Sequence, residues 1–383
     1  MRITIVSRIF APEPGAASLR LKSLVEALAH AGAQVDVMTT APPASKSGQT
    51  DMPARVSRWP VLRDSSGYVR GYLQYMSFDI PAFFRVLFHK RIDVIVVEPP
   101  PTTGLFVRLG SALRRIPYVY FAADIWSDAA GSTGAASWIV SGVRFIEKLA
   151  LSGATHVIAV SDAVADRVKT LAPTAHVTVA GHGVDTSLFT PEGAAPAEPA
   201  DIVYVGTASE WHGASVALDV VIALLTENIE LTAAFIGQGS EWLSLKQRAE
   251  KSSVSARIRV LPTVVPEEAA MWLRSARVSI ATLKPGLGYD FAVPTKIYSS
   301  LASGTPVAYA GPDPVRSMVV DNQLGVATDY DAALLTQQLR ALLEGSGELS
   351  ASSMRAWTQD NVSATAVAGR AATAIMQSAR HDA

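Results

Sequence analysis

Short apolar runs alternate with amphipathic segments from one end of the chain to the other. This alternation is typical of repeated strand–helix units packed around a parallel sheet. The sequence therefore predicts an α/β fold built from doubly wound parallel sheets. Strands are expected at residues 3–7, 34–38, 93–97, 118–121, 156–160 and 176–179, and again at 202–206, 233–237, 258–261, 278–281, 306–309 and 325–327.

The chain of 383 residues is too long for one ordinary hydrophobic core, so two domains are expected. A segment rich in Pro, Ala and Glu separates the two series of strands and is interpreted as a linker. The predicted division is an N-terminal domain at residues 1–190, a linker at 191–200 and a C-terminal domain at 201–350. The Ala-rich tail, residues 351–383, has a helical pattern and is expected to pack back on the N-terminal domain.

The composition excludes several classes of protein. There is no cysteine, which rules out disulfide bonds and thiolate metal sites. Hydrophobic residues make up 49% of the chain and charged residues 17%, which argues against long disordered regions. The first residues read as a strand rather than a signal peptide, and no apolar run is long enough to span a membrane. A cytoplasmic protein is expected.

The net charge of −1 conceals an uneven distribution. Residues 1–190 contain 19 Lys and Arg against 14 Asp and Glu, whereas the remainder contains 14 against 20. The basic half is compatible with a lipid phosphate or a membrane surface, although uneven surface charge without function is an equal alternative. Residues 80–91 combine Phe and Leu with Arg and Lys, which favours an interfacial membrane helix over a core-facing helix with a basic end.

Ligands of open parallel sheets bind beyond the carboxyl ends of the strands, so the loops there are the candidate ligand sites. Two of them carry glycine, at Gly206-Thr207-Ala208 and at Gly237-Gln238-Gly239. Such loops allow backbone N–H groups to approach a phosphate, although glycine in this position is more often only conformational. Two further loops with polar residues cover 124–128 and 286–296.

The segment from Pro294 to Pro306 is more specific. Pro294 and Gly304 bound one short predicted helix, which places Thr295 and Lys296 in its first turn. A lysine there opposes the helix dipole unless an anion lies in front of it. A diphosphate would use the lysine and the dipole together, while a solvated lysine is the alternative.

In their order and spacing these features resemble the family-4 glycosyltransferases of GT-B fold, most closely the branch that builds bacterial surface polysaccharides. The resemblance covers nearly the whole chain. It rests on residues 12–20, Glu98-Pro99-Pro100, Asp124-Ile125-Trp126, Ser161, His182-Gly183-Val184-Asp185, Phe189, Pro191, Tyr204-Val205-Gly206, Gly237-Gln238-Gly239, Pro294-Thr295-Lys296-Ile297-Tyr298 and residues 302–307.

The resemblance implies two Rossmann-like lobes with a cleft between them. The C-terminal lobe would hold a nucleotide-sugar donor, the N-terminal lobe would hold most of the acceptor, and transfer would retain the anomeric configuration. It also implies that no metal is required, and the lack of an Asp-x-Asp motif in a suitable loop agrees with that.

The same resemblance implies roles for single residues. Gly206 and Thr207 should lie against the donor diphosphate, and Lys296, with Pro294 and Thr295, should neutralise it. Gly237, Gly239, Thr263 and Val264 should surround the base and the ribose. The expected acceptor residues are Arg8, Gly15, Ala16 and Arg20, and Trp126 is a candidate for stacking on a sugar ring.

Asp124 is the carboxylate expected to assist the acceptor hydroxyl or the developing positive charge, because it follows a strand of the N-terminal domain. If the acceptor already bears a phosphate, no general base is needed and Asp124 would only orient it. An Asx turn or a helix cap is an equal alternative.

Two departures from the family pattern concern the donor site. The family usually has two glutamates eight positions apart, and here these positions are Phe291 and Ser299. Asp290 is the carboxylate nearest the first position, and Ser299 is a weaker, uncharged acceptor for ribose hydroxyls. The usual Arg and Lys after Gly206 are also absent, which leaves Lys296 as the main cationic candidate.

The sequence thus predicts a metal-independent retaining glycosyltransferase of the hexosyltransferase type. It would move a sugar from a nucleotide-diphosphate sugar, UDP-sugar being favoured, to a lipid-linked, glycan or small-molecule acceptor, without a cofactor or a nucleic-acid partner. A nucleotide-sugar epimerase on the same scaffold and a catalytically impaired sugar-binding relative are the alternatives. A nicotinamide dehydrogenase is disfavoured, because the loop after the first strand lacks the Gly-x-Gly-x-x-Gly pattern.

Overall fold

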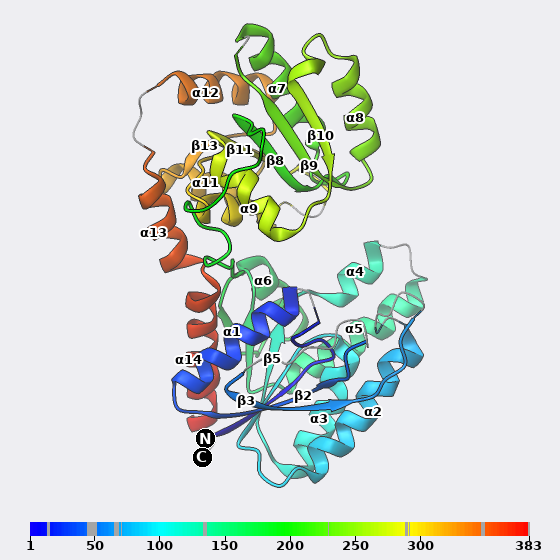
Figure 1. Ribbon diagram of the computed structural model, residues 1–383. Helices are drawn as coiled ribbons and strands as arrows, with labels where there is room; N and C mark the ends of the chain where they lie inside the picture. Colours follow the sequence, from blue (N-terminus) through cyan, green and yellow to red (C-terminus); the bar gives the residue numbers. More distant parts are fainter. Residues whose placement is uncertain are drawn as a thin grey trace. The chain divides into compact units, whose positions relative to one another are not determined.

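The computed structural model describes residues 1–13, 16–43, 52–64, 69, 71–132, 136–228, 230–287, 290, 292–345 and 349–381. The chain forms two compact units (Figure 1). Unit 1 consists of Met1–Gly183 together with Ala364–Ala383, and unit 2 of Val184–Ser363.

Unit 1 contains a seven-stranded sheet in the order β3-β2-β1-β4-β5-β6-β7, and every pair of neighbouring strands is parallel. Its strands are β1 (Arg2–Val6), β2 (Gln34–Thr40), β3 (Ala54–Trp59), β4 (Val94–Val97), β5 (Tyr118–Ala122), β6 (His156–Ala159) and β7 (Val177–Val179). Its helices are α1 (Ala16–His30), α2 (Tyr72–Phe88), α3 (Pro101–Arg114), α4 (Trp126–Ser132), α5 (Ser137–Ser152), α6 (Asp162–Leu171) and α14 (Ala364–His381).

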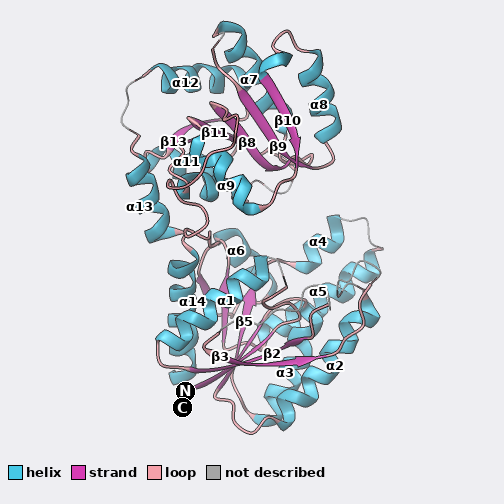
Figure 2. Cartoon of the chain, in the orientation of Figure 1, coloured by secondary structure: helices cyan, strands magenta, loops and turns pink. Residues whose placement is uncertain are grey.

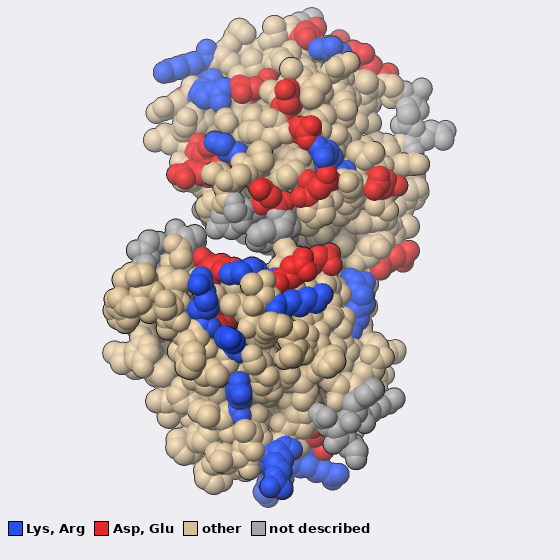
Figure 3. Space-filling view, turned by 180° about the vertical axis from the view of Figure 1, so that it is seen from behind, with Lys and Arg blue, Asp and Glu red and all other residues tan. Residues whose placement is uncertain are grey.

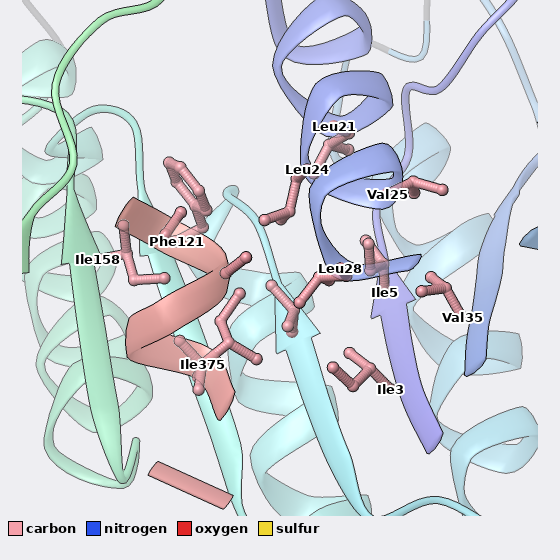
Figure 4. Close-up of a cluster of buried hydrophobic side chains, with 14 of the residues drawn as sticks. Ile3, Ile5, Leu21, Leu24, Val25, Leu28, Val35, Phe121, Ile158 and Ile375 are labelled. Atoms are coloured by element: carbon pink, nitrogen blue, oxygen red, sulfur yellow. The ribbon is translucent and has the colours of Figure 1, made fainter. Parts of the chain in front are cut away.

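Both faces of this sheet are buried, as the nearly continuous apolar runs of its central strands require. On one face, α1 and α14 pack side by side against the strands. Leu24 and Leu28 of α1, Ile375 of α14 and Ile5 of β1 meet in a single apolar cluster (Figure 4). On the other face, a second cluster joins β4 and β5 to residues of α2, α3 and α5.

The edge strand β3 is absent from the sequence prediction, which expected no strand between residues 38 and 93. Its residues alternate between partly buried and exposed, and they include Arg55 and Arg58. A half-exposed edge strand of this kind lacks the apolar run that identifies a buried strand in a sequence.

Unit 2 contains a six-stranded parallel sheet in the order β10-β9-β8-β11-β12-β13. Figure 2 shows the strands between layers of helices. The strands are β8 (Ile202–Thr207), β9 (Ala233–Gln238), β10 (Ile258–Pro262), β11 (Val278–Thr282), β12 (Val307–Ala310) and β13 (Gly325–Thr328). The helices are α7 (Ala214–Glu227), α8 (Trp242–Lys251), α9 (Pro266–Ser275), α10 (Lys296–Ala302), α11 (Val315–Asp321), α12 (Ala332–Glu344) and α13 (Ala351–Asn361), with a 3₁₀ turn at Ser255–Arg257.

The chain passes between the units at residues 183–184 and 363–364, not at the predicted linker 191–200. Those residues belong to unit 2. The guanidinium group of Arg274 on α9 binds the main-chain oxygen of Ala194 within this segment and those of Leu188 and Thr190 just before it. The predicted tail, residues 351–383, is divided as well. Helix α13 packs on α10 in unit 2, whereas α14 packs on α1 in unit 1.

Within the described part of the chain, no helix combines the length and the apolarity needed to cross a membrane. The segment 80–91 was predicted as an interfacial helix. Residues 80–88 form the last part of α2, and residues 89–91 lie beyond its end.

Candidate functional site

The strand order of unit 2 reverses between the neighbouring strands β8 and β11. From β8 the chain continues to β9 on one side of this pair, and from β11 it continues to β12 on the other side. Such a switch point opens a crevice at the carboxyl ends of the strands. Gly206 on β8 and Gly237 on β9 lie directly opposite each other there. A Cβ atom at Gly237 would lie 2.0 Å from the main-chain oxygen of Gly206. The two backbones are therefore so close that only glycine, which has no Cβ atom, fits at position 237.

Lys296 reaches this edge from the start of α10. Its Nζ donates a hydrogen bond of 3.0 Å to the main-chain oxygen of Thr207 and lies 3.7 Å from the ring centroid of Tyr204. The Tyr204 hydroxyl donates to the same oxygen at 2.8 Å. The lysine side chain also runs along Gly206, whose missing Cβ would be 3.4 Å from Lys296 Cε. The structure therefore brings Lys296 against Gly206 and Thr207, although Lys296 lies 89 positions beyond Thr207 in the sequence.

The electrostatics of this edge favour an anion. Desolvation by the surrounding protein lowers the pKa of Lys296 to about 7. Burial and the nearby charge of Lys296 lower the pKa of His212, in the loop after β8, to about 4. At neutral pH the imidazole is therefore uncharged, and an incoming anion would restore the charge of the lysine.

The other predicted residues of unit 2 occupy varied surroundings. Asp290 accepts a hydrogen bond of 2.8 Å from the main-chain N–H of Gly286, so it stabilises its own loop. Ser299 lies within α10, and its N–H bonds to the oxygen of Thr295 at 3.2 Å. Thr263 is exposed after β10, at the same edge of the sheet as Gly239, while Val264 packs against an apolar cluster. Pro294 is buried directly before Thr295, and Phe291 lies outside the described residues.

A second polar cluster lies at the switch point of unit 1, between β1 and β4. Arg20, on α1, donates from Nε and Nη2 to the Oε1 atom of Glu98 at 2.9 and 2.7 Å. Ser7, at the end of β1, donates to the other carboxylate oxygen at 3.4 Å. Glu98 is only 2% exposed, so this ion pair is the contact that keeps its charge tolerable inside the protein.

Asp124 shares Arg20 with Glu98. The aspartate is exposed in the loop after β5, but the surrounding protein partly desolvates its carboxyl group and raises its pKa, an effect that Arg20 opposes. The pKa of buried Glu98 is also raised, chiefly by desolvation and slightly by Asp124. Burial and the charge of Arg20 lower the pKa of His182. The cluster thus holds two carboxylates and a neutral imidazole around one guanidinium group.

The remaining acceptor candidates lie beside this cluster or outside the described residues. Arg8 follows β1, and its guanidinium carbon lies 3.9 Å from the ring centroid of Tyr75 on α2. The rings of Tyr75 and Trp126 form a T-shaped pair, with their centroids 6.0 Å apart. Trp126 is partly buried and is the first residue of α4. Its main-chain N–H donates a hydrogen bond of 2.7 Å to the carboxylate of Glu147. Gly15 is not among the described residues, and Ala16 is described only as the first residue of α1.

The sequence analysis names Glu98, Tyr204 and His182 among the residues that carry the family resemblance, but it predicts no role for any of them. The signal for Glu98 was its position, since it directly follows an apolar strand and precedes two prolines. The contact of Tyr204 with Lys296 had no signal, because only the fold brings a β8 ring beneath a side chain of α10. Among the described residues, no group of three or more His, Asp or Glu is arranged to hold a metal ion.

Two family models match the chain. Residues 15–183 match the glycosyl transferase 4-like domain, and residues 185–358 match the glycosyl transferases group 1 domain. The border between the two matches agrees with the border between the units. None of the curated proteins matches this sequence.

Solved structures with the same fold span the whole chain. Sucrose-phosphate synthase from Thermosynechococcus elongatus superposes with a TM-score of 0.70 at 17% identity, covering 98% of each chain. HepE of Anabaena, in complex with UDP, gives a TM-score of 0.70 at 15% identity and covers 98% of this chain and 100% of its own. WaaG, a glycosyltransferase involved in lipopolysaccharide biosynthesis, gives a TM-score of 0.65 at 13% identity, covering 97% and 99%. At these identities the likeness shows a common fold.

Proposed function

Because the chain belongs to the glycosyltransferases of GT-B fold, in which a 4-like domain precedes a group 1 domain, we propose that it is a retaining, metal-independent hexosyltransferase. Unit 2 would bind a nucleotide-diphosphate sugar, and unit 1 would bind a lipid-linked, glycan or small-molecule acceptor. UDP-sugar is the favoured donor, and the solved complexes of HepE with UDP and with UDP-glucose support that choice. The reaction needs no cofactor besides its two substrates.

The observation that carries this proposal is the position of Lys296 against Gly206 and Thr207. Sugar transfer passes through an oxocarbenium-like state while negative charge grows on the departing diphosphate. A fixed cation together with backbone N–H groups stabilises that charge without reorganising during the reaction. Lys296 is the cation in this role, and the loops that begin at Gly206 and Gly237 let the backbone approach the phosphates.

Ser299 replaces the carboxylate that most of the family places near the ribose. A hydroxyl group accepts a hydrogen bond less strongly than a carboxylate, so donor affinity depends more on the diphosphate end. Thr263, Val264 and Gly239 would contact the base and ribose, since they follow β10 and β9 at the edge that carries Lys296.

On the acceptor side, Asp124 is the proposed catalytic carboxylate. Its raised pKa and its solvent-exposed position suit a group that accepts a proton from a hydroxyl or balances positive charge on the sugar. The guanidinium group of Arg20, which pairs with Glu98, also acts electrostatically on Asp124 and favours its charged form. Trp126 would offer a face to a sugar ring.

We also propose that unit 1 attaches to the inner face of the membrane, where a lipid-linked acceptor for surface polysaccharide synthesis would be found. Helix α3 packs against both α2 and α5, and these three helices expose many large apolar side chains. Phe88 and Trp138 are each 76% exposed. This apolar face also includes Tyr72, Leu73, Ile80, Phe84, Leu109, Leu113, Ile139 and Phe145.

The charges of the apolar face suit anionic headgroups. The three helices contain only two acidic residues, Asp79 and Glu147, and both are buried. Exposed cations adjoin the face at Lys90, Arg91 and Arg144. Figure 3 shows basic side chains crossing a surface of unit 1 that is otherwise largely uncharged. Apolar surface bordered by cations is the composition that binds a membrane interface.

Stabilisation by nucleotide sugars tests the donor assignment. The protein is screened by thermal shift against UDP-, GDP-, ADP- and TDP-sugars, and the hits are followed by detection of released nucleotide with and without candidate acceptors. A donor that stabilises the wild type but not Lys296→Ala supports the proposal. If no nucleotide sugar stabilises the wild type, the transferase assignment fails. Interconversion of the nucleotide sugar without any acceptor would identify the epimerase alternative instead.

A further inference from the structure

Arg8 is a buried cation, and part of its hydrogen-bonding capacity is not used by the described residues. It lies two residues beyond the end of β1 and is only 7% exposed. Its guanidinium group stacks on the ring of Tyr75, 3.9 Å from the centroid. The Nε and Nη1 atoms are both buried, and neither has a hydrogen-bond partner within the described part of the chain.

The nearby carboxylate does not neutralise Arg8 by direct contact. Asp79, on α2, interacts with Arg8 electrostatically, but both of its oxygens accept hydroxyl groups. Oδ2 accepts from Thr102 at 2.7 Å and Oδ1 from Thr103 at 2.6 Å. Arg8 takes part in none of the ion pairs found among the described residues. The hydroxyl of Tyr120, on β5, is also buried without a partner and interacts with Arg8.

An arginine in these surroundings reduces the stability of the free protein. Burying a charge whose donors are only partly hydrogen-bonded costs more free energy than stacking on an aromatic ring returns. Desolvation lowers the pKa of Arg8, which reflects the same unfavourable burial. A residue that stabilises a fold by packing alone would be apolar at this position.

Two contacts connect Arg8 with the acceptor side of the proposed site. Ser7, its neighbour in sequence, donates to Glu98 in the cluster of Arg20 and Asp124. Tyr75, on which Arg8 stacks, also contacts Trp126, two residues after Asp124. A ligand bound to Arg8 would therefore lie beside the residues assigned to the acceptor.

We propose that Arg8 binds an oxyanion of the acceptor, and that the acceptor bears a phosphate near the hydroxyl group that receives the sugar. This inference rests on the proposed transferase function, which supplies the acceptor. Guanidinium groups recognise phosphate through several parallel N–H donors, and the free donors of Arg8 meet that requirement. The unpartnered hydroxyl of Tyr120, which interacts with Arg8, supplies a further donor.

The test replaces the cation with an apolar side chain of similar length, Arg8→Met. Inorganic phosphate is titrated into the wild type and the variant by calorimetry and thermal shift, with UDP present to occupy the donor site and with acetate as a second probe. The dissociation constant for phosphate is expected to rise about tenfold or more in Arg8→Met, with affinity for UDP unchanged. Arg55→Met, an exposed arginine on β3, serves as the control and should retain the phosphate response.

The outcomes separate this inference from the donor assignment. If Arg8→Met loses the response to phosphate, Arg8 is the phosphate-binding residue, whether or not UDP binds. Failure of the donor assignment would instead appear as a lack of stabilisation by UDP. Melting temperature provides a second readout, because removal of a buried cation with unpartnered donors should leave stability unchanged or raised. An unchanged phosphate affinity in Arg8→Met would overturn the proposal. So would a purely structural role, in which Arg8→Met loses stability, Arg8→Lys recovers it, and neither result involves a response to phosphate. Equal binding of acetate and phosphate would reassign the site to carboxylates.

Discussion

The ammonium group of Lys296 and the hydroxyl of Tyr204 donate to one acceptor, the main-chain oxygen of Thr207. The lysine comes from the start of α10 and the carbonyl from the end of β8. This contact holds a partly desolvated cation at the edge of the sheet where the proposed diphosphate would bind.

Donor binding should depend on pH through Lys296. The pKa of this lysine is lowered to about 7, so in the free protein it is charged below that pH and increasingly neutral above it. A diphosphate binds the charged form, which means that binding takes up a proton above pH 7. Donor affinity should fall as the pH rises through 7, by up to about tenfold per pH unit.

Calorimetry in buffers of different ionisation enthalpy measures this proton uptake directly. Near pH 8 the wild type should take up most of one proton on binding UDP, and Lys296→Met should take up none while binding more weakly. Lys251→Met, an exposed lysine on α8, is the matched control and should behave as the wild type. Identical proton uptake in the wild type and Lys296→Met would contradict the assignment.

Asp124→Asn should lower the turnover number by about 10²-fold or more, if the carboxylate acts in general acid–base catalysis. The folded protein should keep its stability, because Asp124 is exposed, and the affinity for the donor should not change. The measurement is the rate of nucleotide release at saturating donor and acceptor. A loss of less than about threefold would leave Asp124 only an orienting role.

Arg20→Gln should destabilise the protein by about 3 kcal/mol at pH 7, because it leaves the buried carboxylate of Glu98 without its partner. In the variant the pKa of Glu98 rises further above that of the unfolded chain. The native state then binds more protons than the unfolded state, and stability falls as the pH rises. Chemical denaturation should accordingly show a smaller defect at pH 5 than at pH 7.

The double variant Arg20→Gln with Glu98→Gln serves as the control for that experiment. It removes both charges together and should recover much of the lost stability. If the double variant is as unstable as the single one, the ion pair is not what supports this part of unit 1.

Substitutions on the apolar face test membrane attachment. Phe84→Ser combined with Phe88→Ser should abolish most sedimentation with vesicles that contain anionic lipid, while the wild type sediments and is released by high salt. Leu243→Ser alters an apolar side chain of unit 2 that is 69% exposed, and it should not affect sedimentation. Equal binding of all three proteins would show that another surface is responsible.

Gly237→Ala should destabilise unit 2 by about 2–4 kcal/mol, because the added methyl group would collide with the oxygen of Gly206. Gly369→Ala, on α14, has open space around the new atom and should be neutral or slightly stabilising, by up to about 1 kcal/mol. Thermal denaturation of the two variants gives the comparison. Equal stability of Gly237→Ala and the wild type would mean that the strands can separate there without cost.

The sequence predicted the two parallel sheets because their strands are local. Runs such as Val94–Val97 are short, apolar and bounded by polar loops, so each can be read without its neighbours. The helix at Pro294 to Gly304 was equally local, since proline and glycine fix its ends. The edge strand β3 was missed because its exposed side chains carry no apolar signal.

Residue identity and spacing in the sequence determined the fold class, the glycine loops and the lysine of α10. Only the tertiary structure decided the partners of these residues. Lys296 meets Thr207 across 89 positions, and Arg20 meets Glu98 across 78. The free donors of Arg8 depend likewise on α2, since Asp79 is already held by two threonines of α3. Burial, charge pairing and pKa arise from groups that the fold gathers from distant segments, so periodicity along one segment carries no record of them.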